Sequence, residues 1–329
     1  MRALVARTLG EPEDVLEPAE IPPPEPGPGL VRVRVGAAAL NLPDVLTCRG
    51  AYILSPEPPF TPGLEVSGTV VALGPGVDPG LLGRRVVSAP ELPDGGFAEE
   101  CLFVAQRAYP VPDEMDHVDA AAMHIAFNSA HVALHRRAGL RPGETLLVHA
   151  GAGGVGSAAI QLGAVAGARV IATAGTPEKC RLCRDLGADE AIDYRSDDFA
   201  AAVRDLTGGR GADVVFDPVG GDVFDRSRRC VANEGRIVLV GFAGGRVQDV
   251  RASHVLMRNY TVMGLYMGAY AVDAAGRAFL YRVHAEVVDL RLQGRIHPVV
   301  GREITLEEVP GALADLGARR TTGKIVARL

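Results

Sequence analysis

The chain has 329 residues, which is enough for about two domains with sizeable hydrophobic cores. Hydrophobic residues make up 47% of it and charged residues 22%, a balance typical of folded globular proteins that excludes intrinsic disorder. The formal net charge of −6, without any evident basic cluster, argues against nucleic acid as the main partner.

The amino-terminal segment and the cysteines lead to expectations about the compartment. Residues 1–15 lack a long apolar run and carry acidic residues early, so we expect no signal peptide. The five scattered cysteines predict no disulfide framework, which favours a reducing, cytoplasmic location. Residues 146–168 carry no charged residue, but the six glycines among them disfavour a membrane span. We therefore expect no membrane segment.

The first 120 residues predict a β-rich domain with long surface loops. Strands are expected at 2–8, 30–38, 66–73, 85–88 and 96–105, where valine and other strand-forming residues recur between turn signals. Residues 21–29 contain five prolines and two glycines, and we interpret them as a surface connector rather than a polyproline ligand. Proline and glycine elsewhere in this region punctuate the strands.

From residue 119 the pattern changes to alternating helices and strands. After a helix at 120–138, strands are expected at 144–149, 168–173, 190–193, 212–216, 235–240 and 260–265, with helices at 154–167, 177–186, 196–207 and 221–230. This alternation predicts an α/β fold with a doubly wound parallel sheet that binds its ligand at the carboxyl ends of the strands. The tail predicts a long helix, a strand at 295–303, a helix at 306–316 and a strand at 323–328, which could rejoin the first domain.

A glycine-rich turn joins the first strand of this alternating region to its helix. Gly151, Gly153 and Gly156 have the spacing G-x-G-x-x-G, between an apolar strand and a small-residue helix. In a dinucleotide site the first glycine makes the turn, the second admits a pyrophosphate, and the third lets helix and strand pack closely. The helix amides then face the anion. The pattern predicts a dinucleotide site rather than an ordinary turn.

The end of the next strand favours NADP over NAD as the coenzyme. NAD-binding units carry an acidic residue there, which holds the ribose 2′-hydroxyl. Here residues 169–173 run into Ala174-Gly175-Thr176 without an acid, and Lys179 follows as a cation for the 2′-phosphate. A solvated helix lysine is the alternative interpretation of Lys179.

Two further patterns have an ordinary structural interpretation. Cys180 and Cys183 have redox spacing, but they fall inside an expected helix and are interpreted as buried thiols. His131 and His135 share a helix face, but without a third ligand in sequence they are interpreted as packing or solvated residues.

A series of motifs along nearly the whole chain resembles one known family. They are Asn41-x-x-Asp44, Arg49-Gly50-x-Tyr52, Pro59-Phe60-x-Pro62-Gly63-x-Glu65, Gly95-Gly96-Phe97-Ala98-Glu99, Ala152-Gly153-Gly154-Val155-Gly156, Gly175-Thr176-x-x-Lys179, Asp193-Tyr194 and Thr322-Gly323-Lys324-Ile325-Val326. Each motif alone is weak, but their order is specific. The chain resembles the zinc-free medium-chain dehydrogenases/reductases of the quinone oxidoreductase (zeta-crystallin-like) family.

The resemblance implies the domain plan, the assembly and the coenzyme contacts. It implies a GroES-like catalytic domain from residues 1–121 and 266–329, an NADP-binding Rossmann domain from 122–265, and a homodimer joined edge to edge near Thr261 to Tyr266. The implied coenzyme-binding residues are Asn128, Ala152, Gly153, Gly154, Val155, Gly175, Thr176, Lys179, Tyr194, Gly241, Phe242, Ala243, Leu265, Tyr266 and Met267.

The implied catalytic residues lie in the first domain. Tyr52 and Asn41 are candidates for contacts with a carbonyl or with nicotinamide, and Asp44 is a candidate for orienting them. From spacing alone, Asn41-Leu42-Pro43-Asp44 is better interpreted as a turn or helix cap with proline at the first helical position, and Tyr52 as a loop aromatic.

The residues at the zinc positions of related dehydrogenases predict that no metal is used. Asn41 stands where those enzymes have a cysteine ligand and Leu64 where they have a histidine, and the four-cysteine lobe for structural zinc is missing. Alcohol oxidation would lose its Lewis acid. We therefore expect an NADPH:quinone oxidoreductase or enone reductase (EC 1.6.5 or 1.3.1 type). The alternatives are an enoyl-thioester reductase of the enoyl-CoA type, or a nucleotide-binding protein with little turnover.

Overall fold

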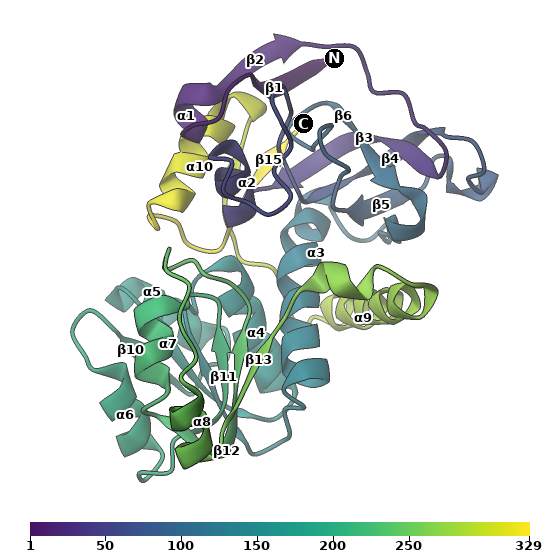
Figure 1. Ribbon diagram of the computed structural model, residues 1–329. Coiled ribbons are helices and arrows are strands. Elements are labelled where there is room, and N and C mark those ends of the chain that lie inside the picture. Colours follow the sequence, from purple (N-terminus) through teal and green to yellow (C-terminus); the bar gives the residue numbers. More distant parts are fainter. The chain divides into compact units, whose positions relative to one another are not determined.

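The computed structural model describes all residues, 1–329, and they form two compact units (Figure 1). Unit 1 comprises Met1–Ile125 and His297–Leu329, and unit 2 comprises Ala126–Ile296. None of the helices in either unit combines the length and the hydropathy that crossing a bilayer requires.

Unit 1 is built around a seven-stranded sheet with the order β14-β15-β3-β4-β5-β7, in which β6 also pairs with β3. A separate two-stranded sheet joins β1 and β2. The strands are β1 (Arg2–Ala6), β2 (Leu16–Glu20), β3 (Leu30–Ala39), β4 (Val66–Leu73), β5 (Arg85–Ser88), β6 (Glu100–Val104), β7 (Tyr109–Pro110), β14 (Val300–Ile304) and β15 (Lys324–Arg328). The helices are α1 (Pro12–Val15), α2 (Leu42–Cys48) and α10 (Val309–Gly317).

Strand β3 shows why this sheet forms. Val31, Val33 and Val35 are buried, whereas Arg32 and Arg34 alternate with them. Each fully buried valine stabilises the fold by about 1.5 to 3 kcal/mol relative to an exposed one. The tail strand β15 pairs antiparallel with the other end of β3, so the expectation that it rejoins the first domain is confirmed.

Unit 2 is a six-stranded parallel sheet with the order β10-β9-β8-β11-β12-β13. Counted from β8, this is the strand order 3-2-1-4-5-6 of a Rossmann fold, as the alternation predicted. The strands are β8 (Thr145–Val148), β9 (Arg169–Ala174), β10 (Glu190–Asp193), β11 (Ala212–Asp217), β12 (Val231–Leu239) and β13 (Thr261–Gly264). The helices are α3 (His117–His131, which begins in unit 1), α4 (Gly154–Val165), α5 (Pro177–Asp185), α6 (Phe199–Leu206), α7 (Gly221–Ser227), α8 (Ala252–Arg258) and α9 (Ala274–Leu292).

The return from unit 2 to unit 1 falls at residue 297 in the structure, and the family resemblance implied a domain boundary at 266. Helix α9 accounts for the difference, because it packs on residues of unit 2. His131 Nε2 lies 3.0 Å from the Glu286 carboxylate of α9, and the Arg136 guanidinium lies 5.8 Å from the centroid of the Phe279 ring. The sequence pattern predicted the helix but gave no sign of the surface it covers.

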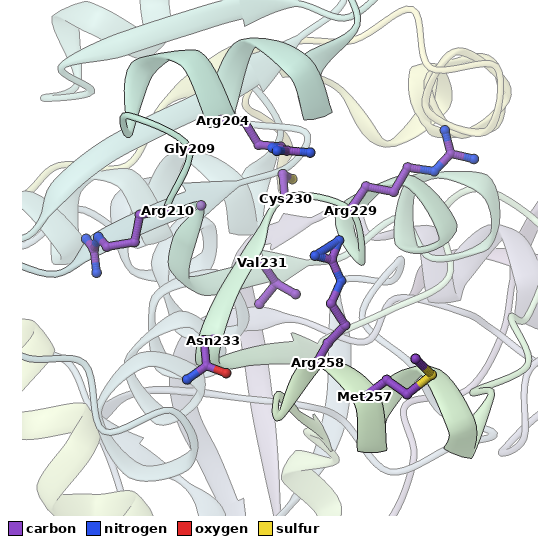
Figure 2. A pocket seen from close by; sticks show the side chains of 10 residues that line it. Arg204, Gly209, Arg210, Arg229, Cys230, Val231, Asn233, Met257 and Arg258 are labelled. Atoms are coloured by element: carbon purple, nitrogen blue, oxygen red, sulfur yellow. The ribbon is translucent and has the colours of Figure 1, made fainter.

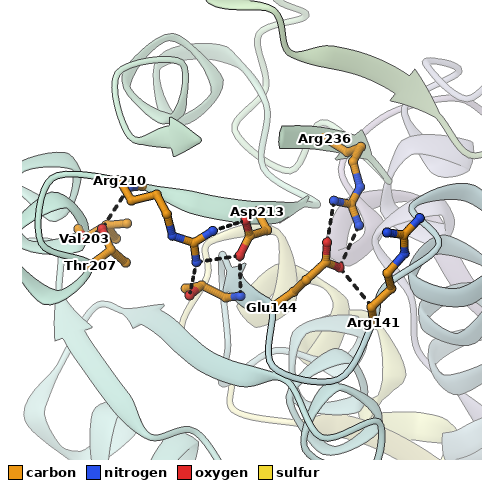
Figure 3. A network of polar contacts seen from close by, with 9 residues as sticks. Arg141, Glu144, Val203, Thr207, Arg210, Asp213 and Arg236 are labelled. Carbon is orange, nitrogen blue, oxygen red and sulfur yellow. Dashed lines mark hydrogen bonds and ion pairs between the residues drawn. The ribbon is translucent and has the colours of Figure 1, made fainter. Parts of the chain in front are cut away.

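Charged side chains anchor the amino ends of the central strands of unit 2 (Figure 3). Arg236 on β12 binds both oxygens of Glu144, at 2.9 and 2.8 Å, and the carboxylate also accepts the Arg141 N–H. Arg210 binds Asp213 through two nitrogens, and Asp213 accepts the Thr145 N–H at 2.7 Å. These bidentate pairs fix the start of β8 to those of β11 and β12.

Candidate functional site

The glycine-rich turn between β8 and α4 has the close packing that its spacing predicts. A Cβ on Gly156 would lie 2.2 Å from the Ala150 carbonyl oxygen, and one on Gly151 would lie 2.8 Å from Cys183 Sγ. Only glycine fits at position 156, where the contact is with backbone, and at position 151 a larger residue would displace Cys183. The first backbone bond inside the helix is donated by the Ser157 N–H to the Gly153 carbonyl. The amides of Gly154, Val155 and Gly156 precede that bond, so they lie where a helix offers N–H groups to an anion.

A basic cluster follows the carboxyl end of β9. Thr176 caps α5 and accepts the Lys179 N–H at 3.2 Å, which fixes the first turn that carries Lys179. A Cβ on Gly175 would lie 2.7 Å from the Tyr194 hydroxyl and 3.4 Å from Arg195 Nε. The pKa of Lys179 is lowered by its burial and, second, by the neighbouring Arg195 guanidinium. Repulsion between the two cations would be relieved by a phosphate between them.

Arg195 is the residue that sequence reasoning missed. It follows Tyr194 directly and is exposed, and its side chain has no ion pair or hydrogen bond within the protein. The sequence did contain a signal for Arg195, since the motif Asp193-Tyr194 directly before it had already assigned the end of β10 to the coenzyme region.

The other predicted coenzyme residues of the loops follow strands β11 to β13 at the same edge of the sheet. After β12, the Ala243 N–H is donated to the Pro218 carbonyl at 3.0 Å, which ties residues 241–243 to the loop after β11. After β13, the Leu265 N–H binds the Leu239 carbonyl, and Tyr266 and Met267 follow it. Carboxyl ends of parallel strands share one edge, so the structure brings these loops to the edge that carries the glycine turn. Asn128 lies apart from these loops in sequence, buried on α3.

Asp217 at the end of β11 is a further group at this edge. It is fully buried, and its Oδ1 accepts the N–H groups of Val219 and Gly220 at 2.9 and 2.8 Å. Its Oδ2 is buried without a partner. Burial raises the pKa of this carboxyl, and the two backbone bonds lower it by less. The carboxylate orders the loop that receives residues 241–243.

In unit 1, Asn41 and Asp44 form the amino-terminal cap of α2. Asp44 accepts the Asn41 N–H at 2.7 Å and the Leu64 N–H at 3.0 Å. Asp44 is fully buried, and burial raises its pKa to about 7. These contacts are those of the helix-cap interpretation, with Pro43 in the first turn.

A buried lysine joins this cap to the carboxyl-terminal strand. Lys324 Nζ donates to Asn41 Oδ1 at 2.7 Å, to Glu65 Oε2 at 2.8 Å and to the Leu40 carbonyl at 3.0 Å. Lys324 is 6% exposed and Glu65 is fully buried. Glu65 also accepts the Ile125 N–H. The sequence marked Lys324 and Glu65 only as motif positions, 259 residues apart, and did not predict their pairing.

The contacts of Asn41 limit what its side chain can do. Its Nδ2 donates to the Ala39 carbonyl at 3.1 Å and to Glu65 Oε2 at 2.9 Å, which uses both amide hydrogens. Asn41 therefore has no donor left for a substrate carbonyl. Tyr52 is half-buried, and its backbone N–H binds the Leu46 carbonyl at 3.2 Å, which holds it in the turn after α2.

The two patterns set aside in the sequence occupy packed positions. Cys180 and Cys183 are buried in α5, and burial raises the pKa of Cys183 to about 12. The rings of His131 and His135 meet edge to face with 4.6 Å between their centroids, and burial lowers the pKa of each. The chain contains no group of three or more His, Cys, Asp or Glu side chains placed to hold a metal ion.

Comparison with known proteins assigns the family. The alcohol dehydrogenase GroES-like domain matches residues 27–113, and the zinc-binding dehydrogenase domain matches residues 154–280. Quinone oxidoreductase-like protein 2 of Bos taurus is 39% identical over 315 residues, 94% of this chain and 88% of the relative. The chain belongs to the quinone oxidoreductase family of medium-chain dehydrogenases/reductases.

Two further relatives are informative about the chemistry of this family. The 2-haloacrylate reductase of Burkholderia sp is 32% identical over 339 residues, 99% of this chain and 98% of the relative. The crystal structure of Escherichia coli quinone oxidoreductase complexed with NADPH matches with a TM-score of 0.92 and 28% identity, covering 100% of both chains.

The zinc in the description of the second matching domain does not fit the residues of this chain. Leu64 offers no ligand atom, and Asn41 Oδ1 and Glu65 Oε2 already accept bonds from the Lys324 ammonium. A divalent ion would have to displace that cation from a buried position. The donor set is that of an internal ion pair and not of a zinc site.

We expect Lys324→Met to lower the free energy of unfolding by about 3 to 5 kcal/mol, because it leaves the Glu65 carboxylate buried without its cation. Adding Glu65→Gln to Lys324→Met should recover part of this loss, since no unpaired charge remains. Chemical denaturation measures the free energy of unfolding of the wild type and of each variant.

The matched control is Arg328→Met on the same strand, because Arg328 is half-exposed and forms surface ion pairs worth about 1 kcal/mol or less. Equal losses for Lys324→Met and Arg328→Met would contradict the role given to the buried pair.

Proposed function

We propose that this chain is an NADPH-dependent, zinc-independent oxidoreductase that transfers hydride to a quinone or an α,β-unsaturated carbonyl compound. The observation that carries the proposal is the carboxyl edge of unit 2. It combines a glycine turn with helix amides for a diphosphate and a cluster of Lys179, Tyr194 and Arg195 for a 2′-phosphate. The named Escherichia coli relative with NADPH and the reductase of a conjugated haloacrylate support the same assignment.

The charges of the residues at the carboxyl edge of unit 2 favour NADPH over NADH. An acid at the end of β9 would repel a 2′-phosphate, and the chain has Ala174 and Gly175 there instead. The second cation, Arg195, strengthens the choice made from Lys179 alone. Residues 152–155 bind the diphosphate, and residues 241–243 and 265–267 flank the nicotinamide. Bound NADPH supplies the hydride.

The acceptor gains one hydride and one proton. In a quinone the two become the hydroquinone hydrogens; in an enone the hydride adds to the β-carbon and the proton to the α-carbon. The negative charge that develops on the acceptor oxygen requires a hydrogen-bond donor. We assign this role to Tyr52, because both hydrogens of the Asn41 amide are engaged within the protein. Asn41 and Asp44 act as positioning residues for the turn that carries Tyr52, and solvent supplies the proton.

Catalysis without zinc follows from the choice of acceptor. Quinones and enones are already electrophilic, so their reduction does not need a Lewis acid to polarise an alcohol oxygen. The ammonium of Lys324, beside Asn41 and Glu65, is saturated by three protein acceptors. We assign it a structural role.

The family resemblance further indicates a homodimer, formed through β13. This strand is the last of the sheet and pairs only with β12, so one side of its backbone is left for a second copy. The five buried, unpaired cysteines agree with a cytoplasmic location.

Lys179→Glu should weaken NADPH binding about ten- to a hundredfold, because it removes a charged hydrogen bond to the 2′-phosphate and adds repulsion. Arg195→Gln should weaken it about tenfold. Fluorescence titration measures both, with NADH as the internal control, because its affinity lacks the 2′-phosphate contribution. Unchanged NADPH affinity in Lys179→Glu would refute the assignment.

A second test addresses turnover and metal together. After exhaustive chelation, NADPH oxidation should continue with members of a panel of quinones and alkenals, and Tyr52→Phe should lower kcat. Complete loss that zinc restores would overturn the metal-free mechanism. Turnover confined to enoyl-CoA compounds would favour the thioester reductase, and no turnover with any acceptor would favour a nucleotide-binding protein.

The proposed homodimer can be tested by measuring the mass of the protein in solution. Sedimentation equilibrium should give twice the 34.5 kDa mass of one chain. A monomer at all concentrations would contradict the pairing of β13 with a second copy.

A further inference from the structure

A pocket of about 260 Å³ lies in unit 2 where the α6–β11 loop, the α7–β12 junction and the end of α8 meet (Figure 2). Its lining residues are Arg204, Gly209, Arg210, Gly211, Arg229, Cys230, Val231, Asn233, Met257 and Arg258. These residues precede β11 and β12 or open them, whereas the coenzyme loops follow these strands. The pocket therefore lies at the amino edge of the sheet, opposite the coenzyme edge.

The wall formed by the α6–β11 loop is rigidly built. The Gly211 N–H donates to Thr207 Oγ1 at 2.8 Å, and the Gly209 N–H donates to the Arg204 carbonyl at 2.7 Å. Gly211 has φ +90°, and a Cβ on it would lie 2.5 Å from the Cys230 carbonyl oxygen. Glycine is thus required for the loop to pack on the start of β12. This packing brings the loop against Cys230, which lines the same pocket.

Three of the four guanidinium groups that line the pocket have no acidic side chain as a partner. Arg210 binds Asp213, but Arg204, Arg229 and Arg258 form no hydrogen bond or ion pair within the protein. The acids nearest in sequence, Asp205 and Glu234, are exposed and do not pair with them. In Figure 2, Arg204 and Arg258 reach toward the pocket from opposite walls, and Arg210 and Arg229 point away.

This cluster is unusual in a chain of net charge −6, in which most other arginines of unit 2 contact a carboxylate, a carbonyl or an aromatic ring. Arg204 and Arg258 both bring an unneutralised charge to the pocket, and a bound anion would offset the repulsion between them.

The pocket also presents a neutral donor and an apolar wall. Asn259 Nδ2 donates to Asn233 Oδ1 at 3.2 Å, which leaves the Asn233 Nδ2 group as a donor for a ligand. Val231 and Met257 add apolar surface beside it. The volume is several times the roughly 30 Å³ that one water occupies in the liquid, so a group of diphosphate size fits.

We infer that this pocket binds a small phosphorylated anion, held by Arg204 and Arg258 as charge-assisted donors and by Asn233. Guanidinium groups bind phosphate oxygens in a bidentate manner, and several on one site favour more than one phosphate. The site is separate from the diphosphate turn and from the Lys179 cluster, and the inference does not depend on the proposed reaction.

Isothermal titration calorimetry with inorganic pyrophosphate at low ionic strength tests the inference on the full chain saturated with NADPH, so that the diphosphate turn at the coenzyme edge is already occupied. The wild type should bind, with an affinity that falls as salt rises. Arg204→Gln together with Arg258→Gln should weaken binding about a hundredfold, roughly tenfold for each charged contact. Both arginines are exposed and unpaired, so thermal unfolding should be unchanged.

The matched control is Arg195→Gln, another exposed and unpaired arginine of unit 2, which lies at the coenzyme edge. It should leave pyrophosphate binding intact. Loss of binding in Arg195→Gln, equal binding in the double variant, or no binding by the wild type would each overturn the inference.

A further titration distinguishes a nucleotide from a free inorganic anion as the ligand. With the coenzyme site again saturated by NADPH, titration with ADP in place of pyrophosphate should give tighter binding if the Val231 and Met257 wall holds an organic group, and equal binding if the free inorganic anion is the ligand. In either case the double variant should lose the interaction, and an undiminished ADP affinity in that variant would overturn the site.

Discussion

A carboxylate removed from water loses several kcal/mol of solvation unless donors in the protein replace its hydration shell. In unit 1, Glu65 meets this requirement with the ammonium of Lys324, the amide of Asn41 and the N–H of Ile125. These donors belong to β15, to the cap of α2 and to α3. One buried charge thereby fixes three segments that are far apart in sequence, and it sets the start of the helix that leads to Tyr52.

The two edges of the unit 2 sheet use different chemistry for anions. At the carboxyl edge, glycines remove side chains so that backbone N–H groups can approach a ligand, and Lys179 and Arg195 add charge beside them. At the amino edge, the backbone amides of the α6–β11 loop are already engaged, and long arginine side chains are the available donors. The parallel arrangement causes this division, because strands turn into helix amino ends only at their carboxyl edge.

The sequence predicts those parts of this protein that depend on neighbouring residues. The order of strands and helices in unit 2, the glycine turn and the missing acid after β9 could all be located, because each is a local pattern of spacing or polarity. The cap of α2 was also visible, through Pro43 and Asp44 next to Asn41.

What the sequence could not show are contacts between distant residues. The partner of Glu65 lies 259 residues later, and the packing of α9 on unit 2 depends on Phe279 and Glu286 meeting residues near position 135. Because the Ala39 carbonyl and Glu65 engage both hydrogens of the Asn41 amide, the role that we propose for Asn41 is that of a positioning residue and not of a donor. Arg195 was overlooked for a different reason: its neighbour Tyr194 already explained the motif.

Strand β15 lies inside its sheet, between β14 and β3, although it is the last strand of the chain. Unit 2, by contrast, is made of one continuous segment. During synthesis, unit 2 can therefore fold while the sheet of unit 1 still lacks an inner strand. Until residues 324–328 emerge from the ribosome, the open side of β3 is an unpaired strand edge and Glu65 lacks its cation. In the nascent chain, unit 1 is thus the part that keeps an unpaired strand edge for longer.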